Sequence, residues 1–201
     1  MKADKYADAF IYCGKALREN PNDAEVQQTA AFIFNRIQDA HIEIEANTAE
    51  EYTMRGIAYF YSGKIEFSID DYTKAIELDD TFDYAYKARH ISYAASGKIN
   101  ESLKDIIKAI QLNPTCALYY FDCANLLSLL PDKKGKSLDY YHKSVELEPN
   151  NFEFWYSFGI EFEEQKYFKD AIIRFEKVLE LNPNFVDAQM RIDRINSLIN
   201  N

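Results

Sequence analysis

The chain has few residues that interrupt helices: its 201 residues include only 6 glycines and 5 prolines. A β-sandwich or barrel needs a turn about every 8–12 residues, so this number is too small for either fold. Hydrophobic residues make up 47% of the chain and aromatic residues 15%, which is enough for a core and argues against wholesale disorder. The composition therefore favours a helical protein.

Long apolar runs and clusters of basic residues are also missing. No stretch of about 18 apolar residues is present, and the N-terminal residues contain no apolar signal-peptide core. The net charge is −10, from 23 basic and 33 acidic residues, which disfavours a phosphate backbone or an anionic lipid surface. We therefore expect a cytoplasmic protein whose partners are neither nucleic acids nor membranes.

The three cysteines and three histidines show no spacing typical of a metal site. Cys116 and Cys123 are seven residues apart, about 10 Å along one helix, which is too far for a disulfide. No phosphate-binding glycine loop, zinc-protease motif or nucleophile elbow occurs. We expect no catalytic residue, no metal and no cofactor, and hence a protein that is not an enzyme.

A period of about 34 residues runs through most of the chain. The tripeptides Leu112-Asn113-Pro114, Leu147-Glu148-Pro149 and Leu181-Asn182-Pro183 place their prolines 35 and 34 residues apart, and Gly63 and Gly97 are 34 apart. Proline cannot continue a helix, so each tripeptide marks the end of a helix. Periods of this length indicate repeated supersecondary units.

Each period predicts two helices. In residues 49–82, Tyr52, Gly56 and Tyr59 fall on one helical face, Gly63 ends that helix, and a second apolar stripe follows. Small residues such as Gly56, Gly159, Ala75 and Ala109 predict places where two helices cross closely. The second example, residues 152–185, has the series Trp155, Gly159, Phe162, Ala171, Phe175, Val178 and Pro183.

This series resembles the tetratricopeptide repeat. The resemblance implies an all-α fold, an α-α superhelix: a right-handed solenoid of stacked antiparallel hairpins with a C-terminal capping helix. His90 departs from the pattern, because its place is taken by a small residue in the family, and we interpret it as a packing residue. The predicted segments are irregular N-terminal helices in 1–48, repeats in 49–82, 83–116, 117–151 (with a one-residue insertion, placed in the turn Pro131–Lys136) and 152–185, and a capping helix in 186–201.

The N-terminal segment leaves two alternatives open. Residues 5–20 fit the second helix of a repeat, but residues 22–48 are too few for a complete one. Either this stretch splits near Ile37–Asp39, or residues 5–20 and 23–46 form an irregular hairpin, which the lack of Gly and Pro favours. In both cases an apolar face lacks a partner, which suggests a homodimer contact or a fragment of a longer array.

The resemblance also implies where a ligand would bind, because in this family the first helices line a concave groove. We expect a protein or peptide segment there, held by half-exposed aromatic and aliphatic side chains, with an acidic C-terminal end that favours Lys or Arg in the ligand. The expected groove residues are Ile57, Phe60, Tyr61, Tyr84, Lys87, Ile91, Phe121, Asn125, Tyr156, Ile160 and Glu163.

Three uses of such a groove remain open at this level. The first is a peptide-binding scaffold, the second a secretion-type dimeric chaperone, and the third a regulatory module of a larger protein. The Lys, Asn and Arg clamp with which some family members hold a C-terminal carboxylate is absent, since the corresponding positions read Lys87 and Ile91, then Asp122, then Tyr156 and Ser157.

Overall fold

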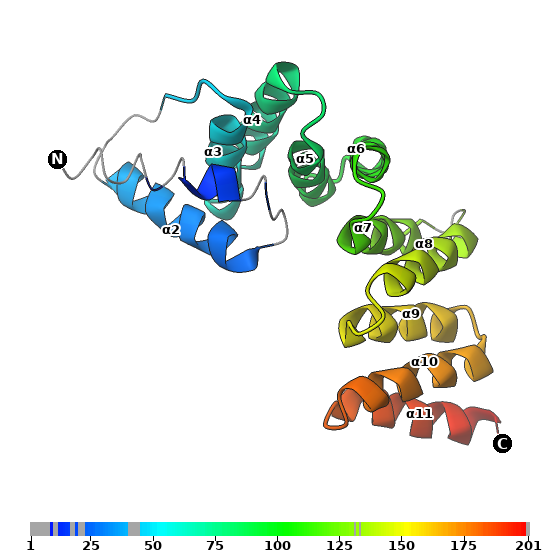
Figure 1. Ribbon diagram of the computed structural model, residues 1–201. Helices are drawn as coiled ribbons and strands as arrows, with labels where there is room; N and C mark the ends of the chain where they lie inside the picture. The colour runs from blue at the N-terminus through cyan, green and yellow to red at the C-terminus, as the bar shows by residue number, and fades with distance from the viewer. Residues whose placement is uncertain are drawn as a thin grey trace. The chain divides into compact units, whose positions relative to one another are not determined.

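The computed structural model describes residues 9, 12–16, 19, 23–39, 45–130, 132 and 134–199. All regular secondary structure within these residues is helical (Figure 1), which confirms the all-α prediction. The helices form two compact units, Met1–Pro114 and Thr115–Asn201. The first unit contains α2 (Ala24–Asp39), α3 (Ala49–Tyr61), α4 (Ile65–Leu78), α5 (Asp83–Ala95) and α6 (Ile99–Leu112). The second contains α7 (Ala117–Ser128), α8 (Lys134–Leu147), α9 (Phe152–Glu164), α10 (Phe168–Leu181) and α11 (Val186–Ile199).

Side chains at the first turn fix where two of the first helices begin. Thr48 Oγ1 accepts the Glu51 N–H at 3.2 Å, and Glu51 Oε2 accepts the Thr48 N–H at 3.2 Å. This reciprocal capping box satisfies N–H groups that have no partner inside α3. Asn151 caps α9 in a simpler way, since its Oδ1 accepts the Glu153 N–H at 3.2 Å.

Three of the hairpins turn through a residue in the left-handed region. Gly63 and Gly97 have φ of 74°, and Lys166, at the matching place after α9, has φ of 64°. In the first turn the Gly63 N–H donates to Phe60 O at 2.9 Å and the Lys64 N–H to Tyr59 O at 2.8 Å. These two bonds close the Schellman arrangement that ends a helix. Glycine adopts this conformation without steric cost, whereas Lys166 does not.

The third hairpin differs in its connection. Residues 129–133 join α7 to α8, whereas residues 62–64, 96–98 and 165–167 suffice in the other hairpins. The expected location of the extra residue, the turn Pro131–Lys136, overlaps this longer connection, although helix α8 already begins at Lys134.

The predicted close crossings are confirmed. A Cβ on Gly56 would meet Tyr72 Cε1 at 2.5 Å, and one on Gly159 would meet Phe175 Cε1 at 2.7 Å. In the 34-residue register, each small residue on a first helix thus faces an aromatic ring on the second. Ala75 and Ala109 are fully buried.

His90 breaks this pairing in the second hairpin of the first unit. It stands in the place of Gly56, and Ile106 stands in the place of Tyr72. Both are buried, at 5% and 0% exposure. The larger first-helix residue is therefore accompanied by a smaller second-helix residue, which keeps the packed volume similar.

The N-terminal part of the first unit packs on α3. Helix α2 is uninterrupted from Ala24 to Asp39, so no split occurs before Asp39, and Glu45–Asn47 are not helical. Cys13, Ala30 and Ile33 join the core around Met54. Residues 40–44 and most of residues 1–22 lie outside the described residues, as does the rest of the two alternatives for this segment.

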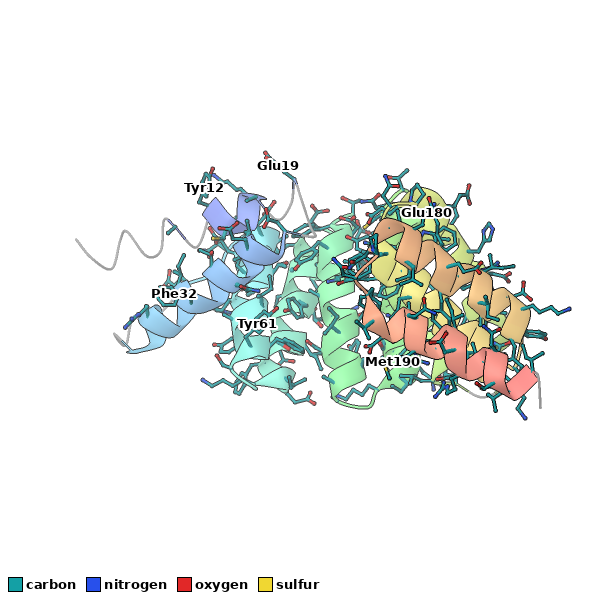
Figure 2. All side chains as sticks on the ribbon, turned by 90° about the horizontal axis from the view of Figure 1, so that it is seen from below. Tyr12, Glu19, Phe32, Tyr61, Glu180 and Met190 are labelled. Atoms are coloured by element: carbon teal, nitrogen blue, oxygen red, sulfur yellow. The ribbon has the colours of Figure 1, made fainter. Side chains whose placement is uncertain are left out.

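Helix α11 closes the second unit. Ala188, Ile192 and Ile195 pack against Phe175 and Val178 of α10. Val186 and Met190 are exposed on the opposite face of the helix, and Leu198 and Ile199 are exposed near its C-terminal end (Figure 2 labels Met190). The helix therefore covers the core of α10 as expected of a capping helix, but it presents an apolar surface of its own.

Candidate functional site

The first unit brings six of the expected groove residues into one hollow. Two successive first helices, α3 and α5, supply them, and Tyr72 of α4 and Ala88 of α5 complete the lining. The six are Ile57, Phe60, Tyr61, Tyr84, Lys87 and Ile91. Residues three and four apart on a helix share a face, which explains why the spacing places them together.

Burial differs sharply among these residues. Tyr61 is 55% exposed at the end of α3, where Figure 2 labels it, and its ring lies edge-on to Phe60 with centroids 5.7 Å apart. Ile57 and Tyr84 are buried, at 4% and 2% exposure. The expected half-exposure therefore holds for Phe60 and Ile91 and not for the residues that form the base of the hollow.

Lys87 has an unusual position for a lysine. Its side chain is 7% exposed, and its Nζ lies 5.6 Å from the centroid of the Tyr84 ring, in cation–π range. The structure gives it no hydrogen bond or ion pair with another described residue, and none of the residues that line the hollow is acidic. Within the described part of the chain, the hollow thus carries a positive charge without a counter-ion.

His90 lies next in the core and is held by the neighbouring helix. Its Nδ1 lies 2.7 Å from Ser102 Oγ, and Ser102 Oγ donates to the His90 main-chain oxygen at 2.9 Å. Burial, with a smaller contribution from the charge of Lys87, lowers the pKa of His90 to about 4. The neutral, hydrogen-bonded ring supports the interpretation of His90 as a packing residue.

The expected groove residues of α7 in the second unit contact their own unit. The Phe121 ring stacks on Phe154 of α9 with centroids 4.5 Å apart. Asn125 Oδ1 accepts the Tyr141 hydroxyl at 2.6 Å. Phe121 and Asn125 are both partly buried. Their surfaces remain available in part, but the amide of Asn125 already has an internal partner.

The expected acidic end of the groove does not hold for Glu163. This carboxylate is 9% exposed and forms ion pairs with Arg191 at 2.6 Å and with Arg194. Arg191 Nε also donates to the Tyr156 hydroxyl at 3.0 Å. Ile160 lies beside these residues in the same core cluster. The charge that we expected to select a basic ligand is neutralised by α11.

Sequence reasoning missed this pair of arginines. They line an open hollow of about 520 Å³ with Tyr156, Asp187 and Met190. A signal for them exists, because Val186 follows Phe152 by 34 residues. Helix α11 is thus in register with a first helix, and Met190 and Arg194 continue the positions of Tyr156 and Ile160.

Comparison with known families supports the repeat period directly. The family model described as "Tetratricopeptide repeat" matches residues 49–82 and 152–185. These two ranges coincide with the hairpins α3–α4 and α9–α10 together with the turns that follow them. The chain therefore contains tetratricopeptide repeats at these two positions. No curated protein matches its sequence.

Solved tetratricopeptide-repeat structures share the fold. YrrB, described as "a TPR protein with an unusual peptide-binding site", has a TM-score of 0.66 at 21% identity, over 84% of each chain. A MamA structure has a TM-score of 0.68 at 19% identity, over 74% of this chain and 81% of that one. TTC0263, described as a thermophilic TPR protein in Thermus thermophilus, has a TM-score of 0.66 at 14% identity, over 94% and 98%.

Metal-binding side chains do not gather in the described part of this chain. No three of its described His, Cys, Asp and Glu side chains could hold one metal ion. The three cysteines are free thiols. No helix in the described ranges is long and apolar enough to cross a bilayer.

Proposed function

We propose that this protein is a non-enzymatic interaction module that binds a peptide or protein segment along its first helices. The observation that carries the proposal is the hollow between α3 and α5, where six independently expected groove residues line one concave surface. The similar YrrB structure, described as having a peptide-binding site, shows that a protein of this fold can take such a ligand. Helical repeats of this kind bind through the surface that their stacked helices create.

The chemistry of the hollow suits a bound side chain. Tyr61 and Phe60 present large rigid rings at its rim, and such rings bury area at small entropic cost. Ile57 and Ile91 add aliphatic surface. In the second unit we propose Phe121, which keeps part of its ring exposed, as a contact residue, together with Tyr156, Ile160 and Asn125.

Buried reactive groups support a role without catalysis. His90, with a pKa of about 4 and an accessibility of 5%, is poorly placed to exchange protons with a substrate. Burial raises the pKa of the Cys123 thiol to about 12, so this cysteine stays protonated and unreactive. We therefore propose binding alone.

A pair of matched tyrosines tests the site. Tyr61, at 55% exposure, touches one phenylalanine edge-on, and so does Tyr167, at 53%, which contacts Phe162 at the α9–α10 turn. We expect Tyr61→Ala to reduce co-purified partner at least about tenfold, the loss typical of an aromatic anchor. Tyr167→Ala should leave it unchanged. Quantitative mass spectrometry of proteins retained from source-organism extract is the measurement.

The opposite result would relocate the site. If Tyr167→Ala loses the partner and Tyr61→Ala keeps it, recognition uses another surface and the groove assignment is wrong. Both variants should stay within about 1 kcal/mol of the wild-type free energy of unfolding, because each ring is more than half exposed.

The dimer expected for a secretion-type chaperone is a second proposal, and it has its own supporting observation. Tyr12 and Phe32, in the N-terminal helices, are 75% and 59% exposed (Figure 2). Exposed aromatic rings are typical of association surfaces. We expect Phe32→Arg to convert a dimer to a monomer in sedimentation equilibrium. Phe67→Arg, on α4 and also 59% exposed, is the matched control, and a wild-type monomer at high concentration would refute the dimer.

A further inference from the structure

We infer that the hollow between α3 and α5 accepts the carboxylate of an Asp or Glu side chain from the bound segment, with Lys87 as its counter-ion. The inference rests on the proposed function, since it requires a protein segment to enter this hollow. It adds the chemical identity of the residue that enters, and the charge it calls for is opposite to the one expected at the C-terminal end of the groove.

The first step is the condition of Lys87 itself. A lysine side chain is rarely so fully buried without a partner, because removing an ammonium group from water is costly unless a charge or hydrogen bonds compensate. Here the compensation within the described residues is the face of the Tyr84 ring, 5.6 Å from Nζ. A cation held in this state binds an incoming anion more strongly than a fully hydrated one does.

The second step is the contrast with the two largely buried arginines of the same unit. Arg55 forms a two-pronged pair with Asp71, with both N–O distances at 2.8 Å. Arg89 does the same with Asp105, at 2.7 and 2.9 Å. Each of these guanidinium groups has a carboxylate supplied by its own hairpin. The described residues supply none to Lys87, so the matching carboxylate is the part that a ligand would bring.

The third step is the surroundings of the charge. Tyr61 lines the hollow with more than half of its surface exposed, and a tyrosine hydroxyl can donate a hydrogen bond to a carboxylate. Ile57 and Ile91 offer aliphatic contact to the methylene groups that carry it. A C-terminal carboxylate is held by several donors, and the lining has no Asn or Arg beside the single ammonium group. The hollow therefore fits the carboxylate of an internal acidic side chain better.

The experiment selects peptides from a displayed library of random dodecapeptides against the wild-type protein. We expect the selected sequences to share one Asp or Glu position next to an apolar residue. For a synthetic peptide of the selected sequence, Asp→Asn or Glu→Gln at that position should weaken binding at least about tenfold, as expected for a hydrogen bond to a charged group. Amidation of the peptide C-terminus should have no effect, and a tenfold loss on amidation instead would overturn the internal side chain as the source.

Three lysine variants complete a double-mutant cycle with the acidic and amide peptides. Lys87→Met removes the charge at similar length and should abolish the preference for the acid. Lys87→Arg should retain most of it, and Lys104→Met, at an exposed lysine of α6, should leave it unchanged. The inference would be overturned if the wild type bound the acidic and amide peptides equally well. It would also be overturned if the preference for the acidic peptide survived in a folded Lys87→Met variant.

Tyr61→Ala separates failure of this inference from failure of the proposed function. One outcome is that the selected peptides bind less tightly to Tyr61→Ala and yet show no preference for an acidic residue. That result would leave the groove function standing and overturn the role of Lys87. Peptides whose binding ignores Tyr61→Ala, or a library that yields no binder, would overturn the groove function and this inference together.

Discussion

The two units have different side-chain interactions at the same pair of positions in the repeat. In the first unit, Arg55 and Arg89, the seventh residues of their hairpins, each form a bidentate ion pair with an aspartate sixteen residues later. These pairs are largely buried: the Arg89 and Asp105 side chains are 14% and 8% exposed. A further bond, from Arg89 Nη1 to Thr73 Oγ1 at 2.9 Å, links this pair to the preceding hairpin.

The second unit uses no carboxylate at these positions. Cys123 hydrogen-bonds with Tyr140 in the third hairpin. In the fourth, Arg174 stands where the first unit has an aspartate, and its guanidinium lies 5.1 Å from the Phe158 ring centroid and 4.6 Å from that of Phe162. The backbone of the repeat thus requires a close contact here, and it leaves open whether charge, hydrogen bonding or cation–π attraction provides it. The first unit should therefore respond more strongly to changes in charge.

Breaking an ion pair of the first unit should have the largest effect. We expect Asp105→Asn to destabilise the protein by about 3 kcal/mol, because it leaves Arg89 buried and without its counter-ion. Tyr140→Phe in the second unit should cost about 1 kcal/mol, the usual value of one hydrogen bond. Urea unfolding followed by circular dichroism gives both numbers.

An exposed pair provides the control for that comparison. Lys74 and Glu77 are 58% and 56% exposed, so Glu77→Ala should change stability by about 0.5 kcal/mol or less. A loss after Asp105→Asn as small as after Glu77→Ala would show that the first unit does not depend on its buried charges.

A lower pH should have the next largest effect on stability, and it should act on the first unit through His90. Its pKa is about 4 in the folded protein against 6.5 for an ordinary histidine, so between these pH values the unfolded chain binds more protons. Stability is therefore complete above pH 6.5 and falls as the pH decreases. By pH 4.5 we expect a loss of about 2 kcal/mol that His90→Gln abolishes.

The second unit lacks a titrating group at this place, since Ala124 and Gly159 occupy it. Trp155, the single tryptophan, belongs to that unit and reports on it by fluorescence. Circular dichroism should show acid destabilisation that Trp155 fluorescence does not follow. An equal pH response of wild type and His90→Gln would contradict this assignment.

Adding a methyl group at the close crossings should have the smallest effect, and the same one in both units. Gly56→Ala and Gly159→Ala force a Cβ against Tyr72 and Phe175, and overpacking should outweigh the helix-propensity gain by about 1 kcal/mol. Gly135→Ala, with nothing within 4 Å, should stabilise instead. Thermal unfolding compares the three, and stabilisation by Gly56→Ala alone would show that the crossings differ.

The period of the prolines and glycines was sufficient to predict the helical hairpins and the close crossings. Leu112-Asn113-Pro114 and its counterparts mark helix ends by backbone geometry alone, which does not depend on distant contacts. The pairing of Arg89 with Asp105 could not be read in this way. It depends on which side chains two helices direct toward each other, and the second unit shows that this position tolerates several chemistries.

The sequence was sufficient to predict which residues lie together in the candidate site, but not how the charged side chains there are paired. Ile57, Tyr61 and Lys87 were expected on one surface from their place in the repeat, and they line one hollow. The acidic end that we expected in the second unit is not available to a ligand in this form, because Glu163 pairs with Arg191 of α11, 28 residues later in the chain. Burial of Lys87 depends on the Tyr84 ring, and no property of the sequence period specifies that contact.

Helices in each unit pack almost entirely on the helices next to them in the chain. In the first unit α2 contacts α3, α3 contacts α4, and so on to α6; in the second the same order runs from α7 to α11. Contacts between residues close in sequence require little loop closure before they form. Each hairpin can therefore nucleate by itself and extend to its neighbours, so refolding should be fast, on the microsecond to millisecond scale of helical proteins, and should not wait for the two ends of the chain to meet.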